Sequence, residues 1–104
     1  MRALARSTGL DTHVDASIVT TTGGVSQQMI AQQQDRHYLF IQNADSVRMW
    51  VDWGKSATMG WPSVFLDPGD NLTEEGNFVS GEAVFVISSK AGHQIVCRTG
   101  GSIP

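Results

Sequence analysis

Turn-forming residues interrupt this chain at the spacing of about 8–12 residues that is typical of small β-proteins. The segments between the turns are rich in Val, Ile, Thr and aromatic side chains, which favour strands. Only 16% of the residues are charged, so the Lys and Glu that build long exposed helices are scarce. The pattern predicts an all-β fold, either a single β-sandwich or a jelly-roll-like small barrel of about seven to eight strands.

The expected strands lie at residues 16–22, 25–31, 36–43, 47–53, 62–67, 82–89 and 93–99. A helix over residues 26–34 is the competing interpretation of the second segment, because Gln and Met tolerate both states. The pair Gly23-Gly24 and the short loop Lys90-Ala91-Gly92 predict hairpins, the second of which joins the last two strands. The sequence Asp-Pro-Gly-Asp at residues 67–70 has the Pro and Gly of a type II turn.

The 104 residues fit one domain. By size alone, folding would bury only about 65% of the unfolded surface, which leaves a thin core. Residues 1–15 show little apolar periodicity and are expected to form an N-terminal arm or leader. The β-sandwich domain is expected over residues 16–99, followed by a flexible tail at residues 100–104. A partner surface would compensate for the thin core.

Several expected strands are apolar on both faces. Because alternate residues of a strand point to opposite sides, Trp50 points away from the side shared by Met49 and Val51. A sheet of a two-layer sandwich buries only one of its faces in the core. The second face therefore meets another subunit, unless the strands curl into a crowded barrel or the outer aromatic residues cover one another. The candidate interface residues are Tyr38, Phe40, Arg48, Trp50 and Trp61.

Charge and hydropathy exclude two classes of partner. The net charge of -3 and pI near 5.4 argue against direct binding to nucleic acid, which requires cations that neutralise phosphates. Uninterrupted apolar runs are far shorter than the ~20 residues that cross a bilayer, so no membrane span is expected. No apolar signal-peptide region follows the first basic residues, and we expect the protein to stay where it is made.

No catalytic constellation is recognisable. The three histidines, His13, His37 and His93, lie far apart in sequence, and none has a second His or Cys at metal-ligand spacing. The acidic stretch from Asp67 to Glu75 lacks the pattern of a calcium loop and is better explained as solvated turn charges. Cys97, the single cysteine, sits in the middle of an expected strand and is interpreted as a buried structural thiol. We expect no enzymatic activity, no cofactor and no metal.

Four segments resemble a loose group of small tailed-bacteriophage virion proteins. They are RHYLFIQNADS at residues 36–46, MWVDWGKSAT at 49–58, SVFLDPG at 63–69 and AVFVISS at 83–89. The shared pattern consists of R-x-x-L-x-I-Q-N, an aromatic-V-D/N-x-G-x-x-A-T block, a strand ending in P-G, and a closing β-hairpin. These motifs are strand and turn signals, and they carry no catalytic residue.

The resemblance implies a structural protein of the virion, made in the cytoplasm of a host bacterium. A capsid decoration or cement protein that docks on the outer capsid surface is the first expectation, because an acidic protein is ill suited to face packaged DNA. The implied partners are the major capsid protein or another virion protein, together with further copies of the chain, and a trimer is expected. The alternatives are a head-fibre or tail-attached β-module and a carbohydrate-binding sandwich that stacks a sugar on Trp50 or Trp61.

Overall fold

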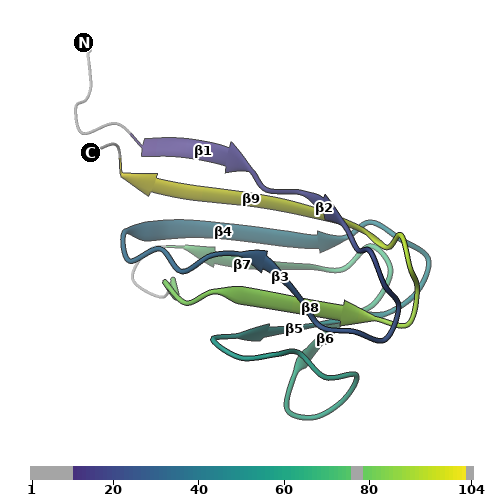
Figure 1. Ribbon diagram of the computed structural model, residues 1–104. Helices are drawn as coiled ribbons and strands as arrows, with labels where there is room; N and C mark the ends of the chain where they lie inside the picture. The colour runs from purple at the N-terminus through teal and green to yellow at the C-terminus, as the bar shows by residue number, and fades with distance from the viewer. Residues whose placement is uncertain (1–10, 76–78, 103–104) are drawn as a thin grey trace.

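The computed structural model describes residues 11–75 and 79–102, which form nine strands in two antiparallel sheets packed face to face (Figure 1). The prediction of an all-β sandwich is confirmed. The competing helix over residues 26–34 is wrong, because residues 27–30 form a strand. None of the described residues belongs to a helix that is long and apolar enough to cross a membrane.

The first sheet runs in the order β1-β9-β4-β7, and the short β2 also pairs with β9. Its strands are β1 (Asp11–Asp15), β2 (Ile18–Val19), β4 (Arg36–Asn43), β7 (Asn71–Glu75) and β9 (Gln94–Ser102). The second sheet runs in the order β3-β8-β5-β6. Its strands are β3 (Gln27–Ile30), β5 (Met49–Trp53), β6 (Val64–Leu66) and β8 (Val84–Ser88).

Both predicted hairpins are wrong, because the chain crosses between the sheets at these points. Residues 23–24 connect β2 of the first sheet to β3 of the second, and residues 90–92 connect β8 of the second sheet to β9 of the first. Glycine conformation alone does not decide whether the flanking strands pair. The turn at residues 67–70 has the predicted geometry, since Gly69 has a φ of 86° and the Asp70 N–H donates to the Asp67 carbonyl at 2.9 Å.

Strands extend into the expected N-terminal arm and the expected C-terminal tail, both of which were predicted to lie outside the sandwich. Residues 11–15 of the expected arm form β1, and residues 100–102 of the expected tail belong to β9. Asp11 lies opposite Ser102, so the described chain enters and leaves the sandwich at one end (Figure 1). The rest of the arm and tail, residues 1–10 and 103–104, lies outside the described residues. Strand β7 was missed, because its acidic residues resemble a solvated loop.

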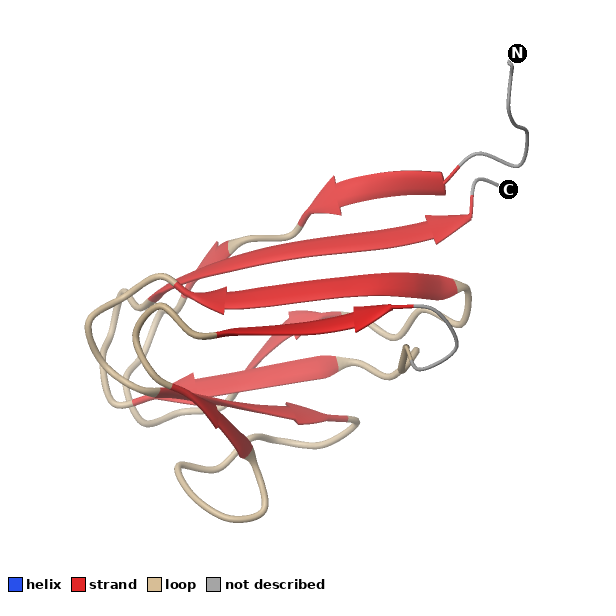
Figure 2. Ribbon diagram, turned by 180° about the vertical axis from the view of Figure 1, so that it is seen from behind, coloured by secondary structure: helices blue, strands red, loops and turns tan. Residues whose placement is uncertain are grey.

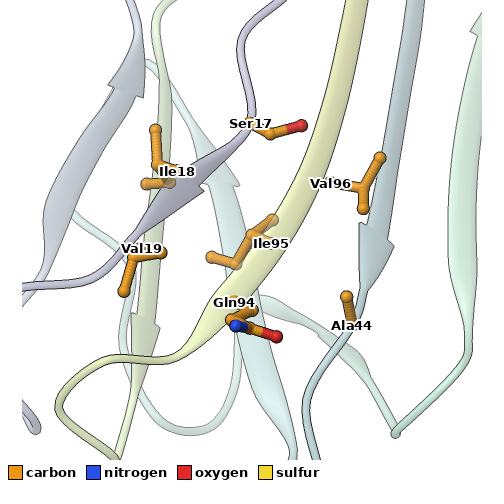
Figure 3. Close-up of a pocket in the computed structure, with 7 residues that line it drawn as sticks. All are labelled: Ser17, Ile18, Val19, Ala44, Gln94, Ile95 and Val96. Carbon is orange, nitrogen blue, oxygen red and sulfur yellow. The ribbon is translucent and has the colours of Figure 1, made fainter.

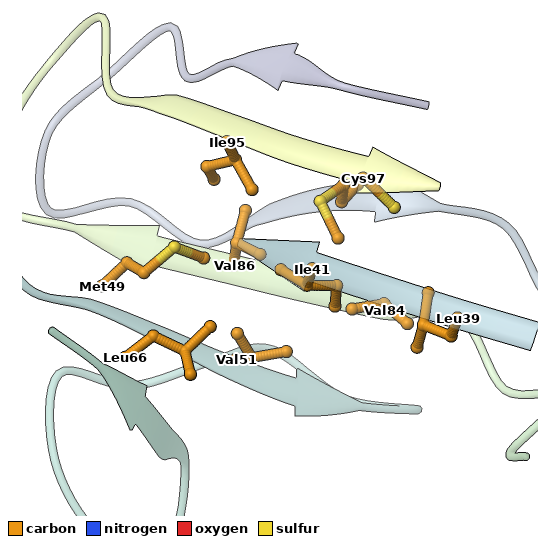
Figure 4. Close-up of a cluster of buried hydrophobic side chains, with 10 residues drawn as sticks. Leu39, Ile41, Met49, Val51, Leu66, Val84, Val86, Ile95 and Cys97 are labelled. Carbon is orange, nitrogen blue, oxygen red and sulfur yellow. The ribbon is translucent and has the colours of Figure 1, made fainter. Parts of the chain in front are cut away.

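The hydrophobic core lies between the inward faces of the two sheets (Figure 4). Alternation along β4 and β5 sends Leu39, Ile41, Met49 and Val51 inward, where all four are fully buried. Each such side chain stabilises the fold by about 1.5–3 kcal/mol relative to an exposed one. The complete cluster is Met29, Leu39, Ile41, Met49, Val51, Leu66, Val84, Val86, Ile95 and Cys97.

A buried polar residue stands at each end of the central strand β4. At its end, Asn43 donates from Nδ2 to the carbonyls of Val47 at 2.8 Å and Leu66 at 2.9 Å. Leu66 belongs to the second sheet, so this side chain ties the two sheets together. At the start of β4, the Arg36 guanidinium donates to the carbonyls of Ala31, Ser80 and Glu82 at 2.8–2.9 Å. These two polar side chains satisfy backbone groups of the connections at opposite ends of the sandwich.

His93 completes the polar cluster around Asn43. Its fully buried ring places Nε2 at 2.8 Å from Asn43 Oδ1, which also accepts from the backbone N–H of Asp45 at 3.0 Å. Because that amide oxygen is an acceptor, Nε2 carries the proton in the neutral ring. Nδ1 is buried without a hydrogen-bond partner among the described residues. Burial is the largest effect and lowers the pKa of His93; the charge of Asp45 opposes it, and the charge of Lys90 adds a smaller lowering effect.

Replacing Asn43 is expected to destabilise the sandwich strongly. Asn43→Ala leaves buried carbonyl and N–H groups without partners, at about 1–3 kcal/mol for each orphaned group, and we expect a loss of about 3 kcal/mol or more. Urea unfolding measures the change. The neighbouring half-buried Gln42 provides the control, and Gln42→Ala should cost about 1 kcal/mol or less. Equal losses for the two variants would contradict the role assigned to Asn43.

His93 should make the fold acid-sensitive below its ordinary pKa of 6.5. The folded state resists protonation at Nδ1, whereas the unfolded state takes the proton freely. The free energy of unfolding should therefore fall as the pH drops below 6.5, by at most about 1.4 kcal/mol per pH unit. The measurement is urea unfolding between pH 7.5 and 5, compared with His93→Gln, whose amide donates without titrating. An identical pH dependence in both proteins would exclude His93 as the cause.

Candidate binding surfaces

The five candidate interface residues lie on two opposite outer faces. Tyr38 and Phe40 alternate with the buried Leu39 and Ile41 along β4, so they lie on the outside of the first sheet. Trp50 lies between two buried residues of β5 and is therefore on the outside of the second sheet. The orientation predicted for Trp50 agrees with this placement. The interface role of all five residues stays a prediction.

The outer face of the first sheet combines aromatic, charged and small side chains. Phe40 lies opposite Arg98 of β9 and Thr73 of β7, and Tyr38 lies opposite Gly100 and Glu75. Arg98 donates to the Asp15 carboxylate at 2.7 Å, which joins β9 to β1 across this face. Hydrogen bonds from Ser17, together with Arg98, lower the pKa of Asp15. Both Tyr38 and Phe40 remain half-buried on this face.

A shallow apolar groove of about 320 Å³ opens along β9 of the same sheet (Figure 3). Figure 3 shows its residues gathered around β9, with β2 on one side and the end of β4 on the other. Val19 lies opposite Gln94, and Val96 is two residues further along β9, so these three side chains share the face that carries Phe40. The groove is lined by Ser17, Ile18, Val19, Ala44, Gln94, Ile95 and Val96.

A second hollow, of about 460 Å³, lies on the outside of the second sheet. It brings together three of the five candidate residues with four that the sequence analysis did not single out. Trp61 is 93% exposed, Phe65 50% and Met59 48%. We call it the aromatic hollow, and it is lined by Arg48, Trp50, Met59, Gly60, Trp61, Ser63 and Phe65.

The loop between β5 and β6 carries Trp61 and projects away from the first sheet (Figure 2). Hydrogen bonds fix its path: Ser63 Oγ donates to Asp52 Oδ2 at 2.9 Å and accepts from the Thr58 N–H at 3.0 Å. The Ala57 N–H donates to Ser26 Oγ at 2.9 Å, and the Ala57 side chain is buried. Trp61 is therefore presented on an anchored loop.

Arg48 forms the polar rim of the aromatic hollow. Its Nε donates to Asp67 Oδ1 at 2.6 Å and one terminal nitrogen donates to Oδ2 at 3.3 Å, which makes a two-point ion pair. The guanidinium carbon lies 4.0 Å from the centroid of the Phe65 ring. Hydrogen bonding to Asp67 raises the pKa of Arg48 above its usual value. The rim thus presents a cation paired with a carboxylate.

Sequence reasoning missed Phe65, Met59 and Ser63 of the hollow because their placement depends on strand pairing and on the folded loop. Cross-strand pairing with Trp50 puts Phe65 on the outer face, and this register cannot be predicted from the β6 sequence alone.

Within residues 11–75 and 79–102, no group of three or more His, Cys, Asp or Glu side chains is placed to hold a metal ion.

Cys97 is a core residue, and its thiol should react slowly. It is fully buried, and burial raises its pKa from 9.0 to about 11. Near neutral pH this lowers the thiolate fraction roughly a hundredfold, in addition to the steric protection. Iodoacetamide at pH 8 should label the native protein at least roughly a hundredfold more slowly than the urea-unfolded chain. Labelling at the same rate in both states would show that Cys97 is accessible.

Comparisons with known proteins support the fold alone. No protein-family model matches the chain, and no curated protein matches its sequence. One solved structure is similar, that of a chain described in the words "Bacillus endospore appendages form a novel family of disulfide-linked pili". The TM-score is 0.54 at 10% sequence identity, over 97% of this chain and 98% of the other. The chain therefore shares its overall sandwich architecture with that appendage protein.

Proposed function

We propose that this chain is a structural protein of a bacteriophage virion, a decoration protein that docks on the outer surface of the capsid. The observation that carries the proposal is the pair of half-buried aromatic residues, Tyr38 and Phe40, on the outside of the central strand β4. The described residues place no third layer over this face. Aromatic and Arg side chains are enriched at protein interfaces, and Arg98 lies beside Phe40.

In the proposed decoration role, the docking partner is the major capsid protein. The groove lined by Val19 and Val96 continues the apolar surface along β9, so a partner segment has a recess to fill beside Phe40. The net charge of -3 favours the outside of the shell over the side that faces packaged DNA. The role requires no catalysis and no cofactor, and the location is the virion.

The likeness to an appendage protein supports a role in an assembly, and it favours a second candidate, a head-fibre or tail-attached module. That neighbour is described as a subunit of disulfide-linked pili. In this chain the single cysteine is buried in the core, so self-association would be non-covalent. A trimer on the capsid is our proposal for the oligomeric state.

Virion binding by matched variants tests the proposal. Phe40→Ala should weaken binding to purified capsids by about 2 kcal/mol if Phe40 is an interface anchor, whereas Trp61→Ala on the opposite face should bind normally. Circular dichroism of the isolated variants checks that both remain folded. Occupied capsids should release DNA at a higher temperature than bare ones, because a ligand of the assembled shell stabilises it.

Three results would contradict the decoration role. The protein could be found only on the tail, which would favour the fibre or tail module. Capsids that carry the protein at every site yet release DNA at the same temperature as bare capsids would show that the protein binds without stabilising the shell. Equal capsid binding by Phe40→Ala and the unchanged protein would contradict docking through the first sheet, the observation on which the decoration role rests.

A further inference from the structure

We propose that the aromatic hollow on the second sheet is a binding site for a neutral oligosaccharide. The first observation is the exposure of Trp61, whose side chain is 93% accessible on a loop held by Ser63 and Asp52. Trp50 and Phe65 are cross-strand neighbours, and both line the hollow. Exposed aromatic surface of this kind marks binding sites, and an anchored loop reduces the entropy lost on binding.

The polar groups at the rim match the hydroxyl groups of a sugar. Each hydroxyl is both a donor and an acceptor, and the Arg48–Asp67 pair presents N–H donors and carboxylate oxygens side by side. Both side chains are 45% exposed, so they are accessible to a ligand. Their charges compensate each other, which favours a neutral ligand over an anion or a cation.

The aromatic side chains of the hollow match the apolar C–H groups of a sugar ring. One face of a pyranose ring presents C–H groups, which pack on the electron-rich face of an indole ring. A ligand stacked on Trp61 within the hollow would have Arg48 as a polar neighbour, because both residues line it. This mixture of apolar planes and a few convergent polar groups is typical of small-molecule sites.

Size favours a short oligosaccharide over a protein. The hollow is lined by seven residues, whereas a stable protein interface uses about 20–30 residues on each side. Its volume of about 460 Å³ lies within the range of about 300–1,000 Å³ for small-ligand sites. The hollow and the proposed docking face lie on opposite sheets, so a docked protein would keep the hollow open to solvent. The inference therefore goes beyond the proposed docking function and does not depend on it.

Titration with defined sugars tests the proposal. The probes are cellotriose, maltotriose and triacetylchitotriose, each added to about 20 mM so that even a site with a Kd of about 1 mM is nearly saturated. The readout is the indole N–H NMR signal of each of the three tryptophans. At least one probe should shift the Trp50 and Trp61 signals saturably, whereas Trp53, which packs against the core, should stay unchanged.

Matched variants locate the site. Trp61→Ala removes an exposed side chain and should weaken binding at least roughly tenfold without unfolding the protein. Arg48→Lys keeps the charge but loses the two-point geometry, and it should also weaken binding. Val25→Ala, at another exposed apolar side chain outside the hollow, should bind normally.

Three outcomes would overturn the inference. The first is the absence of indole shifts with all three sugars at the highest concentration. The second is unchanged binding by Trp61→Ala. The third is a shift of the same indole signals by a proline-rich peptide but by none of the sugars, which would make the hollow a peptide groove. Loss of capsid binding alone would leave these readouts unaffected, so the two proposals fail independently.

Discussion

Two buried polar side chains, Arg36 and Asn43, fix the ends of β4, and the rest of the sandwich is arranged around them. Each donates hydrogen bonds to carbonyls of segments that join or belong to the opposite sheet. A buried carbonyl without a partner costs about 1–3 kcal/mol, so these bonds strongly favour one relative placement of the sheets. Hydrophobic burial between the sheets is non-directional and tolerates sliding, whereas the hydrogen bonds do not.

This arrangement explains the motif R-x-x-L-x-I-Q-N in structural terms. Arg36 and Asn43 are the buried donors at the two ends, and Leu39 and Ile41 between them fill the core. In this chain the residues of the motif are therefore structural. This explains why a likeness based on strand and turn signals carries information on architecture.

The sequence was informative where local chemistry decides the conformation. The bounds of β4 and the turn at residues 67–70 were predicted correctly, because alternation and the Pro-Gly pair are local signals. Strand pairing is not local, and both predicted hairpins failed because the strands on either side of each turn belong to different sheets. The outward orientation of Trp50 was legible, but the aromatic hollow was not. Its shape depends on the register of Phe65 and on the hydrogen bond between Ser63 and Asp52, which only the folded loop creates.

The pairing of Asp11 with Ser102 has a mechanical consequence. A force that pulls these two ends apart would act across the β1–β9 ladder and load its hydrogen bonds one pair at a time, as in unzipping. Such peeling needs far less force than shearing two strands along their length, where all bonds are loaded together. A particle or filament that strained this domain through its ends would thus detach β1 first, while β4, inside the sheet and fixed at both ends, would keep the core closed.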